Sequence, residues 1–432
     1  MSKDRGNSTP RFESHQLEPG LELHLRQDVR RKTHRLQVSW VGDLDQNAAA
    51  RALVPNCLLR GTTRDPSIVA VSRRSEELWG AVLTGDVLKS GEVHVIQYTL
   101  EFVDDAYLPD RSGILSDCTH FLSEVLADPH LVEGRFPEEV VQQEKQKQRR
   151  LIESLINNKR SYANFRCTQE ACSGERFRLH EYGTVEELEG IDASSLTDLW
   201  RRLVASSPKH VHFSGNLETS AVLDALAPVL QGHQGDPLPL KGPTAPRSAG
   251  DPREVVEEME VQQADLVFCF RTEVNQSSEL LEPLVIANGI LGVFAHSKLF
   301  LNVREKASLC YYVGSRLENS VGLLFISSGI DVAKYSLAKE KILEQVEDLK
   351  AGHFTDDDLL ATQKSFDNHL RVLEDLPAAL MGIDLSWRLA GRQTDPVEYR
   401  KRLLAVTRDQ VIEAVSHVEL DTAYLLRPAG RA

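Results

Sequence analysis

Apolar and polar residues alternate in two stretches of the first half of the chain, residues 36–40 and 96–102. A period of two is typical of strands with one buried face, so both stretches predict β-strands. Between them, residues 48–59 favour a helix. A second, amphipathic helix is expected at residues 114–125, ended by Pro129.

The same order of elements returns in the second half. The sequence predicts a strand at residues 266–270, a helix over 280–303 and an apolar strand over 323–330. A further amphipathic helix is expected at residues 335–349, stopped by Gly352. An internal duplication that produced two domains of one fold is the economical account of this repetition.

Residues 232–253 separate the two halves and are rich in Pro and Gly without an apolar period, which is typical of a linker. We therefore expect an N-terminal domain of residues 1–231 and a C-terminal domain of residues 254–432, as a chain of 432 residues allows. The mixture of elements predicts the α+β class, in which each domain has a mixed or antiparallel sheet with helices packed on one face.

Composition excludes several classes of protein. The net charge of −14 argues against nucleic-acid binding as a main role. The six cysteines form no C-x-x-C pair, so neither a zinc ribbon nor a disulfide scaffold is expected. No apolar run approaches the ~18 residues that span a bilayer, and the first residues have no signal-peptide pattern. We expect a cytoplasmic protein that does not enter a membrane.

The most informative stretch is LFLNVREKASLCYY, residues 299–312. It resembles the C-terminal signature of the pitrilysin-type (insulinase-type) zinc peptidases, which include processing-peptidase-like proteins with a LuxS/MPP-like metallopeptidase fold. In that family an Arg and a Tyr seven residues apart reach an active site whose metal ligands lie on another domain, often on another chain. Here these residues are Arg304 and Tyr311. The resemblance implies that Tyr311 stabilises the charge on the carbonyl oxygen and that Arg304 orients the substrate.

The same resemblance implies a His-x-x-Glu-His zinc motif shortly before an apolar-basic-Gly-Thr cluster, which is present here at residues 58–62. The positions of the two histidines and the glutamate hold Ala52, Asn56 and Pro55. Alanine has no donor atom, the amide of asparagine is a poor zinc ligand, and proline supplies no general base and breaks a helix. We expect a degenerate site and no metal in this chain.

The other histidines and acids offer no clear replacement. His210 and His212 share one face of a strand, but no acid or cysteine is near them in sequence. This favours two exposed or edge-strand histidines over a metal pair. His296 is interpreted as a surface or helix-end residue. The acids nearest to the family's third-ligand position are Glu144 and Glu153.

A lost zinc motif beside a retained Arg304 and Tyr311 leads to the main hypothesis. The chain is a non-catalytic subunit of a heterodimeric zinc peptidase, inactive alone, and a sister subunit supplies both the His-x-x-Glu-His motif and the zinc. It closes a chamber around a peptide substrate and donates the two residues to the sister's site. The alternative is a non-enzymatic scaffold or assembly protein of the same fold. A peptidase with unconventional metal ligands is the weakest hypothesis, because no compact His/Cys/Glu cluster replaces the lost motif.

Overall fold

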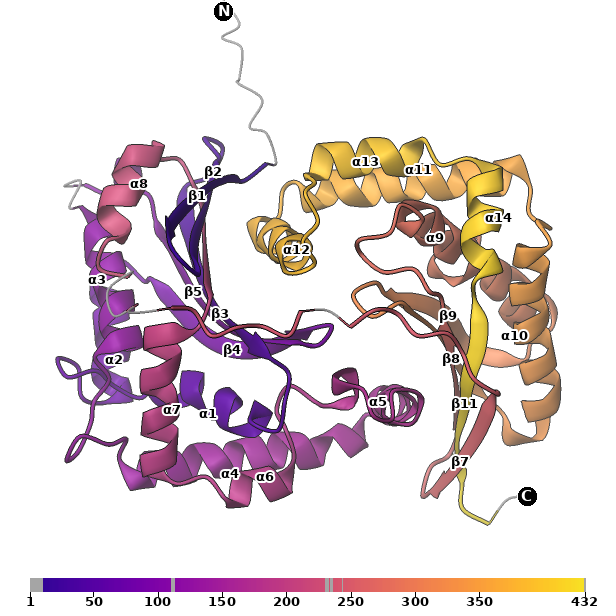
Figure 1. The fold of residues 1–432 in the computed structure, drawn as a ribbon, viewed down its shortest axis with the longest axis horizontal. Coiled ribbons are helices and arrows are strands. Elements are labelled where there is room, and N and C mark those ends of the chain that lie inside the picture. Colours follow the sequence, from indigo (N-terminus) through magenta and orange to yellow (C-terminus); the bar gives the residue numbers. More distant parts are fainter. Residues whose placement is uncertain (1–10, 110–112, 230–232, 234–235, 243, 431–432) are drawn as a thin grey trace, which may run out of the picture. The chain divides into compact units, whose positions relative to one another are not determined.

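The computed structural model describes residues 11–109, 113–229, 233, 236–242 and 244–430, and these form two compact units, each built on one sheet (Figure 1). Each unit also takes a segment from the other half of the chain. Unit 1 comprises Met1–Ile152, His180–Lys241 and Leu376–Ser386, and unit 2 comprises Glu153–Leu179, Gly242–Asp375 and Trp387–Ala432.

The described part of unit 1 contains a six-stranded sheet in the order β1-β2-β6-β3-β5-β4. β2 and β6 run parallel and the other neighbours run antiparallel, so the sheet is mixed. The strands are β1 (Glu13–Glu18), β2 (Leu21–Gln27), β3 (Thr33–Asp43), β4 (Val82–Ser90), β5 (Val93–Val103) and β6 (Lys209–Gly215).

Helices cover one face of this sheet (Figure 1), where the alternating apolar residues of β3 and β5 form the core with residues of the helices. Leu36, Val38 and Trp40 are all buried, as the sequence alternation predicted. The expectation that only one face of this strand is buried is wrong, because Gln37 and Ser39 on the other face are buried too. The helices of the unit are α1 (Ala48–Leu58), α2 (Ile68–Glu77), α3 (Ile114–Ala127), α4 (Glu138–Ser154), α6 (Val185–Glu189), α7 (Ala193–Ser206) and α8 (Thr219–Leu226).

The described part of unit 2 contains a five-stranded sheet in the order β7-β11-β8-β10-β9, with β7 and β11 parallel. Counted along the unit, the order is first, last, second, fourth, third. Unit 1 has the same order once β1 is set aside, which agrees with an internal duplication. The strands are β7 (Arg253–Met259), β8 (Ala264–Arg271), β9 (Cys310–Glu318), β10 (Leu323–Ile330) and β11 (Glu419–Pro428).

Most helices of unit 2 pack on one face of its sheet, and α5 (Lys159–Ala171) packs on the other. The expected α+β fold with two similar domains is confirmed by this architecture. The remaining helices are α9 (Leu281–Asn288), α10 (Tyr335–Lys350), α11 (Asp356–Leu373), α13 (Pro396–Leu404) and α14 (Arg408–Ser416), and α12 (Pro377–Leu389) contributes its first part to unit 1.

The continuous helix predicted over residues 280–303 is wrong. After α9 the chain forms the π-helical segment η4 (Gly289–Val293), leaves the helical conformation, and forms a second π-helical segment, η5 (Leu299–Lys306). Glycine weakens a helix, but close packing requires glycine at both position 289 and position 292. A Cβ atom at Gly289 would lie 2.5 Å from Thr362 of α11, and one at Gly292 would lie 2.6 Å from Ser315 of β9.

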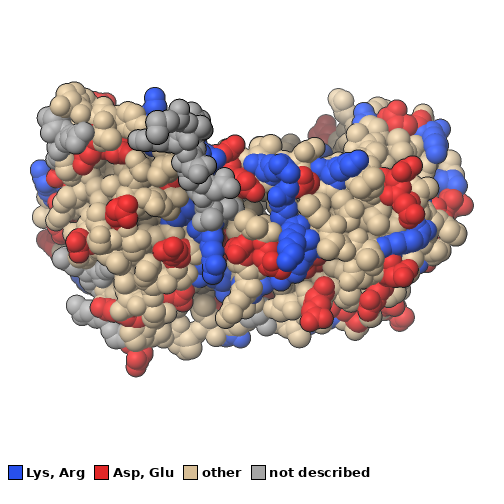
Figure 2. Space-filling view, turned by 90° about the horizontal axis from the view of Figure 1, so that it is seen from above, with Lys and Arg blue, Asp and Glu red and all other residues tan. Residues whose placement is uncertain are grey.

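The surface carries both signs of charge. On the face drawn in Figure 2, Asp and Glu side chains are interspersed with Lys and Arg, so the net charge of −14 does not gather there into one acidic surface. None of the helices in the described ranges is long and apolar enough to cross a membrane.

Candidate functional site

The positions of the family's zinc motif lie on α1, and none of them presents a ligand. Ala52 and Pro55 are buried. The ring of Pro55 faces β4, where a Cβ atom at Gly85 would lie 3.1 Å from it. The Asn56 amide turns back on its own helix, where Nδ2 donates to the Ala52 carbonyl at 3.3 Å.

One of the two acids nearest to the family's third-ligand position is already neutralised by cations. Glu144 of α4 is buried and accepts hydrogen bonds from Arg60 at 3.1 Å and from Lys147 at 2.7 Å. Burial also raises the pKa of the neighbouring Cys57 thiol, which disfavours the thiolate that a metal would need. Glu153 is exposed. The residues at this position therefore do not fit a zinc ion.

Arg304 lies in the last turn of η5. Its guanidinium group lies 4.6 Å from the centre of the Phe300 ring, and its Nε atom lies 3.8 Å from Glu305. The side chain is 41% exposed, so both contacts leave it accessible. π-Helical turns are rare and occur frequently at functional sites, which makes this position notable on backbone grounds alone.

Tyr311 lies near the start of β9, at the edge of the unit 2 sheet, and is 71% exposed. The pairing of β9 with β10 skips it, because Tyr312 pairs with Gly329 and Cys310 pairs with Ile330. Such a β-bulge redirects a side chain out of the regular pleat. The bulge leaves the phenol of Tyr311 accessible to another molecule.

The neighbouring Tyr312 is fixed within unit 2. Its hydroxyl donates to Asp265 at 2.6 Å, and the Arg160 guanidinium lies 4.1 Å from the centre of its ring. Burial and the Asp265 carboxylate raise the pKa of Tyr312 above its ordinary value. Of the two adjacent tyrosines, the one singled out by its spacing from Arg304 is thus the exposed one.

The segments that carry Arg304 and Tyr311 pack against each other, since η5 contacts β9. Between them, Ser308 adopts a φ of 50°, a left-handed conformation that is uncommon outside glycine. Burial raises the pKa of Cys310, and the positive charge of Arg304 opposes that shift. Within the described residues, no hydrogen bond or ion pair joins the Arg304 and Tyr311 side chains. The structure brings their segments together and leaves both side chains accessible.

The interpretation of His210 and His212 as exposed or edge-strand residues is wrong. Their strand, β6, lies inside the sheet between β2 and β3, and the His212 side chain is buried. His212 Nε2 lies 2.9 Å from the Asp384 carboxylate, and His210 Nδ1 lies 3.9 Å from that of Glu22. Both acids are more than 170 residues away in sequence, so no local pattern could have revealed them. His296 is half-buried beside Thr362, at 3.1 Å.

The chain thus has two α+β units, and α1, at the position of the family's zinc motif, presents no metal ligand. These features are those of a metallopeptidase-type fold with a degenerate zinc site. Residues 190–366 match the family model described as the Peptidase M16 inactive domain. Over 411 residues, the chain is 31% identical to the probable inactive metalloprotease YmfF of Bacillus subtilis (strain 168), covering 94% of this chain and 96% of that protein. The chain therefore belongs to the M16, or pitrilysin-type, peptidase family and is an inactive member of it.

Solved structures agree on the fold. A conserved protein from Enterococcus faecalis V583 is 25% identical and superimposes with a TM-score of 0.88 over 98% of this chain and all of the other. A peptidase M16 inactive domain from Pseudomonas fluorescens has a TM-score of 0.80 at 15% identity, over 97% of this chain and 98% of the other. Both likenesses extend over nearly the full length, so the fold of both units is a property of the family.

Proposed function

We propose that this chain is the non-catalytic subunit of a heterodimeric zinc peptidase. A sister subunit with a His-x-x-Glu-His motif provides the zinc and the general base, and this chain helps to close the chamber around a peptide. Arg304 and Tyr311 are donated to the sister's site. There the phenol donates a hydrogen bond to the carbonyl oxygen of the scissile bond as negative charge develops, and the guanidinium orients the peptide backbone.

One contrast carries the proposal. The positions of the lost zinc motif are occupied by buried residues and an amide that bonds its own helix, whereas Tyr311 projects from a bulge and is 71% exposed. An exposed tyrosine on an edge strand contributes little to the core of unit 2. Its accessibility, beside a π-helical segment that carries Arg304, supports a role towards another molecule.

Peptide hydrolysis tests this proposal. The rate of zinc-dependent cleavage of quenched fluorescent peptides is measured for the full chain alone and for the complex that it forms in its native cells. We expect the chain alone to be inactive and the complex to be active. Within the complex, Tyr311→Phe should lower kcat by about 100-fold, as loss of one oxyanion-stabilising donor does. Arg304→Ala should cost about as much, because a misplaced substrate reacts about 100-fold more slowly.

Matched variants control for general damage. Tyr107→Phe removes a hydroxyl from another exposed tyrosine, which is 53% exposed. Arg149→Ala removes a guanidinium that is 39% exposed and holds one weak ion pair, with Glu189 at 3.5 Å. Both controls should leave the rate unchanged. A complex without a His-x-x-Glu-His subunit, or unchanged rates for Arg304→Ala and Tyr311→Phe, would favour the alternative, a non-enzymatic scaffold of the same fold.

A further inference from the structure

A second group of potential metal ligands lies on the unit 1 sheet, away from α1. It consists of Glu22 and His24 of β2 and His210 of β6. In the parallel register of these strands, Glu22 lies opposite His210 and His24 lies opposite His212, so all of these side chains share one face of the sheet. The alternating apolar residues point the other way, into the core, and they include Leu21, Leu23, Leu25, Val211 and Phe213. The register therefore fixes the group in place.

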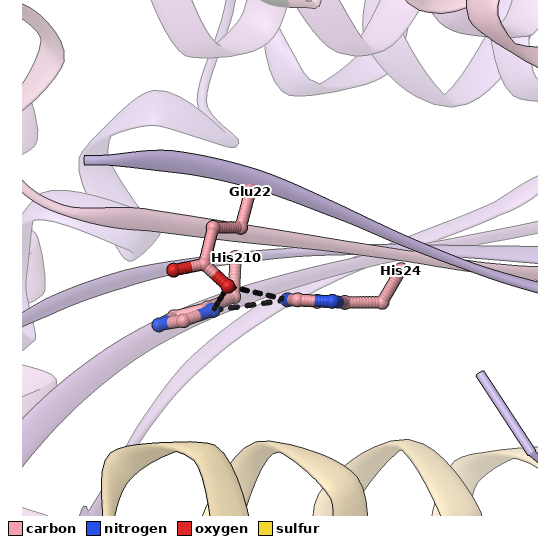
Figure 3. Close-up of side chains that lie close together, drawn as sticks. All are labelled: Glu22, His24 and His210. Atoms are coloured by element: carbon pink, nitrogen blue, oxygen red, sulfur yellow. Dashed lines mark hydrogen bonds and ion pairs between the residues drawn. The ribbon is translucent and has the colours of Figure 1, made fainter. Parts of the chain in front are cut away.

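The three donor atoms converge on one point (Figure 3). His24 Nε2 lies 3.0 Å from His210 Nδ1, the Glu22 carboxylate lies 3.8 Å from His24 Nε2, and it lies 3.9 Å from His210 Nδ1. A triangle with these sides has a circumradius of about 2.1 Å, so one position is about 2.1 Å from all three atoms, which is the usual length of Zn–N and Zn–O bonds. Little movement is needed to bind an ion.

A neighbouring side chain orients the buried histidine. Ser14 of β1 lies opposite His24 in the strand pairing, and its hydroxyl lies 3.1 Å from His24 Nδ1. When Nδ1–H donates to this hydroxyl, Nε2 is the unprotonated nitrogen and can act as a ligand. Metal-binding histidines commonly have such a partner on their second nitrogen. His210 then needs only the tautomer with the proton on Nε2 for both imidazoles to act as ligands.

The exposure of the three side chains suits a site with a vacant coordination position. His24 is fully buried, His210 is 12% exposed and Glu22 is 36% exposed, so Glu22 is the most accessible of the three side chains. Two imidazoles and one carboxylate suit zinc, and three protein ligands leave a fourth position for water. We propose that Glu22, His24 and His210 form a Zn²⁺ site, separate from the family's degenerate motif on α1. Zinc bound at this site would contradict the expectation that this chain holds no metal.

Zinc titration of the tag-free full-length chain, followed by calorimetry, tests the site. We expect one Zn²⁺ per chain. Loss of a partner that only orients a ligand weakens metal binding by about 10–100-fold, so Ser14→Ala should fall in that range and Glu22→Gln or His210→Gln should cost about 100-fold or more. The variants avoid the fully buried His24, and Glu22→Gln alters only a partly exposed carboxylate.

The chain offers a matched control in unit 2. His417 and Glu273 form another histidine–carboxylate pair, 3.7 Å apart and partly exposed, without a second imidazole among the contacts described for them. His417→Gln and Glu273→Gln should leave zinc affinity unchanged. Co²⁺ provides an independent readout, because a site with two imidazoles and a carboxylate gives visible d–d absorption that His210→Gln should abolish. Absence of stoichiometric binding, or binding that Glu22→Gln and His210→Gln leave intact, would overturn the proposal and leave a hydrogen-bonded histidine pair.

Discussion

Apart from the additional strand β1, the two sheets share their strand order. The sheet face that lies away from the main helical layer nevertheless differs between the two units. In unit 2 this face is apolar and packs under α5. Its contributors are Val267, Cys269, Phe325, Tyr424 and Leu426 of the sheet and Ala163, Cys167 and Ala171 of α5. In unit 1 the corresponding face is polar although largely buried. It carries Glu22, His24, Arg26, His210 and His212.

The difference shows how one topology supports two kinds of surface. Burying polar groups costs free energy unless each is paired, whereas burying apolar groups is favourable. Unit 1 meets this cost with specific pairs, such as Arg26 with Asp28 at 3.1 Å and His212 with Asp384 at 2.9 Å. If the face of unit 1 served only to pack against other segments, apolar residues like those of unit 2 would be sufficient. The polar face of unit 1 is therefore the better candidate for ligand-binding chemistry, as function resides in sites and not in folds.

The largest expected effect comes from breaking the apolar face. Phe325 is fully buried under α5, and Phe325→Ala should lower the free energy of unfolding of unit 2 by about 3–5 kcal/mol through lost burial and a cavity. Hydrogen exchange of amides in β8 and β10 under native conditions measures this loss. Val256→Ala, at a largely exposed position on β7, should change it by less than about 0.5 kcal/mol. A similar small change for Phe325→Ala would mean that α5 does not form a core with this sheet.

The histidines provide a second test of the comparison, because the stability of the two units should respond differently to pH. Burial lowers the pKa of His94 on β5 to about 4, and it also lowers the pKa of His34 on β3, whereas the five strands of unit 2 contain no histidine. Because the folded-state pKa of His94 is below its unfolded value of about 6.5, the folded form binds fewer protons between these values. The stability that the neutral ring contributes is present above pH 6.5 or so and is lost as the pH falls towards 4.

The expected loss from His94 alone is about 3 kcal/mol in unit 1. Hydrogen exchange of β3 and β5 amides between pH 7 and 4 measures it. His94→Gln keeps a donor for the Glu181 carbonyl, which His94 Nε2 approaches to 2.8 Å, and should flatten this part of the pH profile. His353→Gln, at an exposed histidine of unit 2, should leave the profile unchanged. An unaltered profile in His94→Gln would show that this ring is not the acid-sensitive group.

Much of the fold could be predicted from local patterns, because burial of one strand face imposes a period of two. This period predicts the strands at residues 36–40 and 96–102, whereas the strand at residues 323–330, buried on both faces, is predicted by its run of apolar residues. The order of these elements also reveals the repetition between the halves. The break at residues 294–297 was missed, since no local pattern shows the contacts that Gly289 and Gly292 make with distant residues.

The candidate sites differ in the same way: some could be recognised from residues close together in the sequence, and others depend on contacts between distant residues. The degenerate motif at Ala52, Pro55 and Asn56 could be located because the resemblance to the family places it shortly before the cluster at residues 58–62, which is close by in sequence. The neighbourhood of His210 could not, because strand pairing between residues 22 and 210 creates it. The bulge at Tyr311 could not be predicted from the sequence either, because it depends on the register of β9 against β10. The roles of Arg304 and Tyr311 stay predictions.

The next effect is smaller and depends on the proposed zinc site. A ligand that binds only the folded state stabilises it by about 2.7 kcal/mol at 100 times its Kd. Zinc at that concentration should therefore raise the stability of unit 1 by about this amount and leave unit 2 unchanged, as hydrogen exchange in β2 and β6 compared with β8 would show. Glu22→Gln should remove the difference between the units. Equal protection of both units by zinc would point to binding elsewhere.

The smallest effect concerns the helix that covers the apolar face. Asn158 caps α5, since its side-chain carbonyl accepts a hydrogen bond from the backbone N–H of Ser161 at 3.1 Å. Asn158→Ala should cost about 1 kcal/mol, the usual value of an N-cap, and Asn158→Gly should cost only a few tenths. Exchange of amides in α5 measures both variants. If the two were equal and large, Asn158 would act through contacts beyond the cap. If both were without effect, α5 would be held by its apolar contacts with β8, β10 and β11 alone.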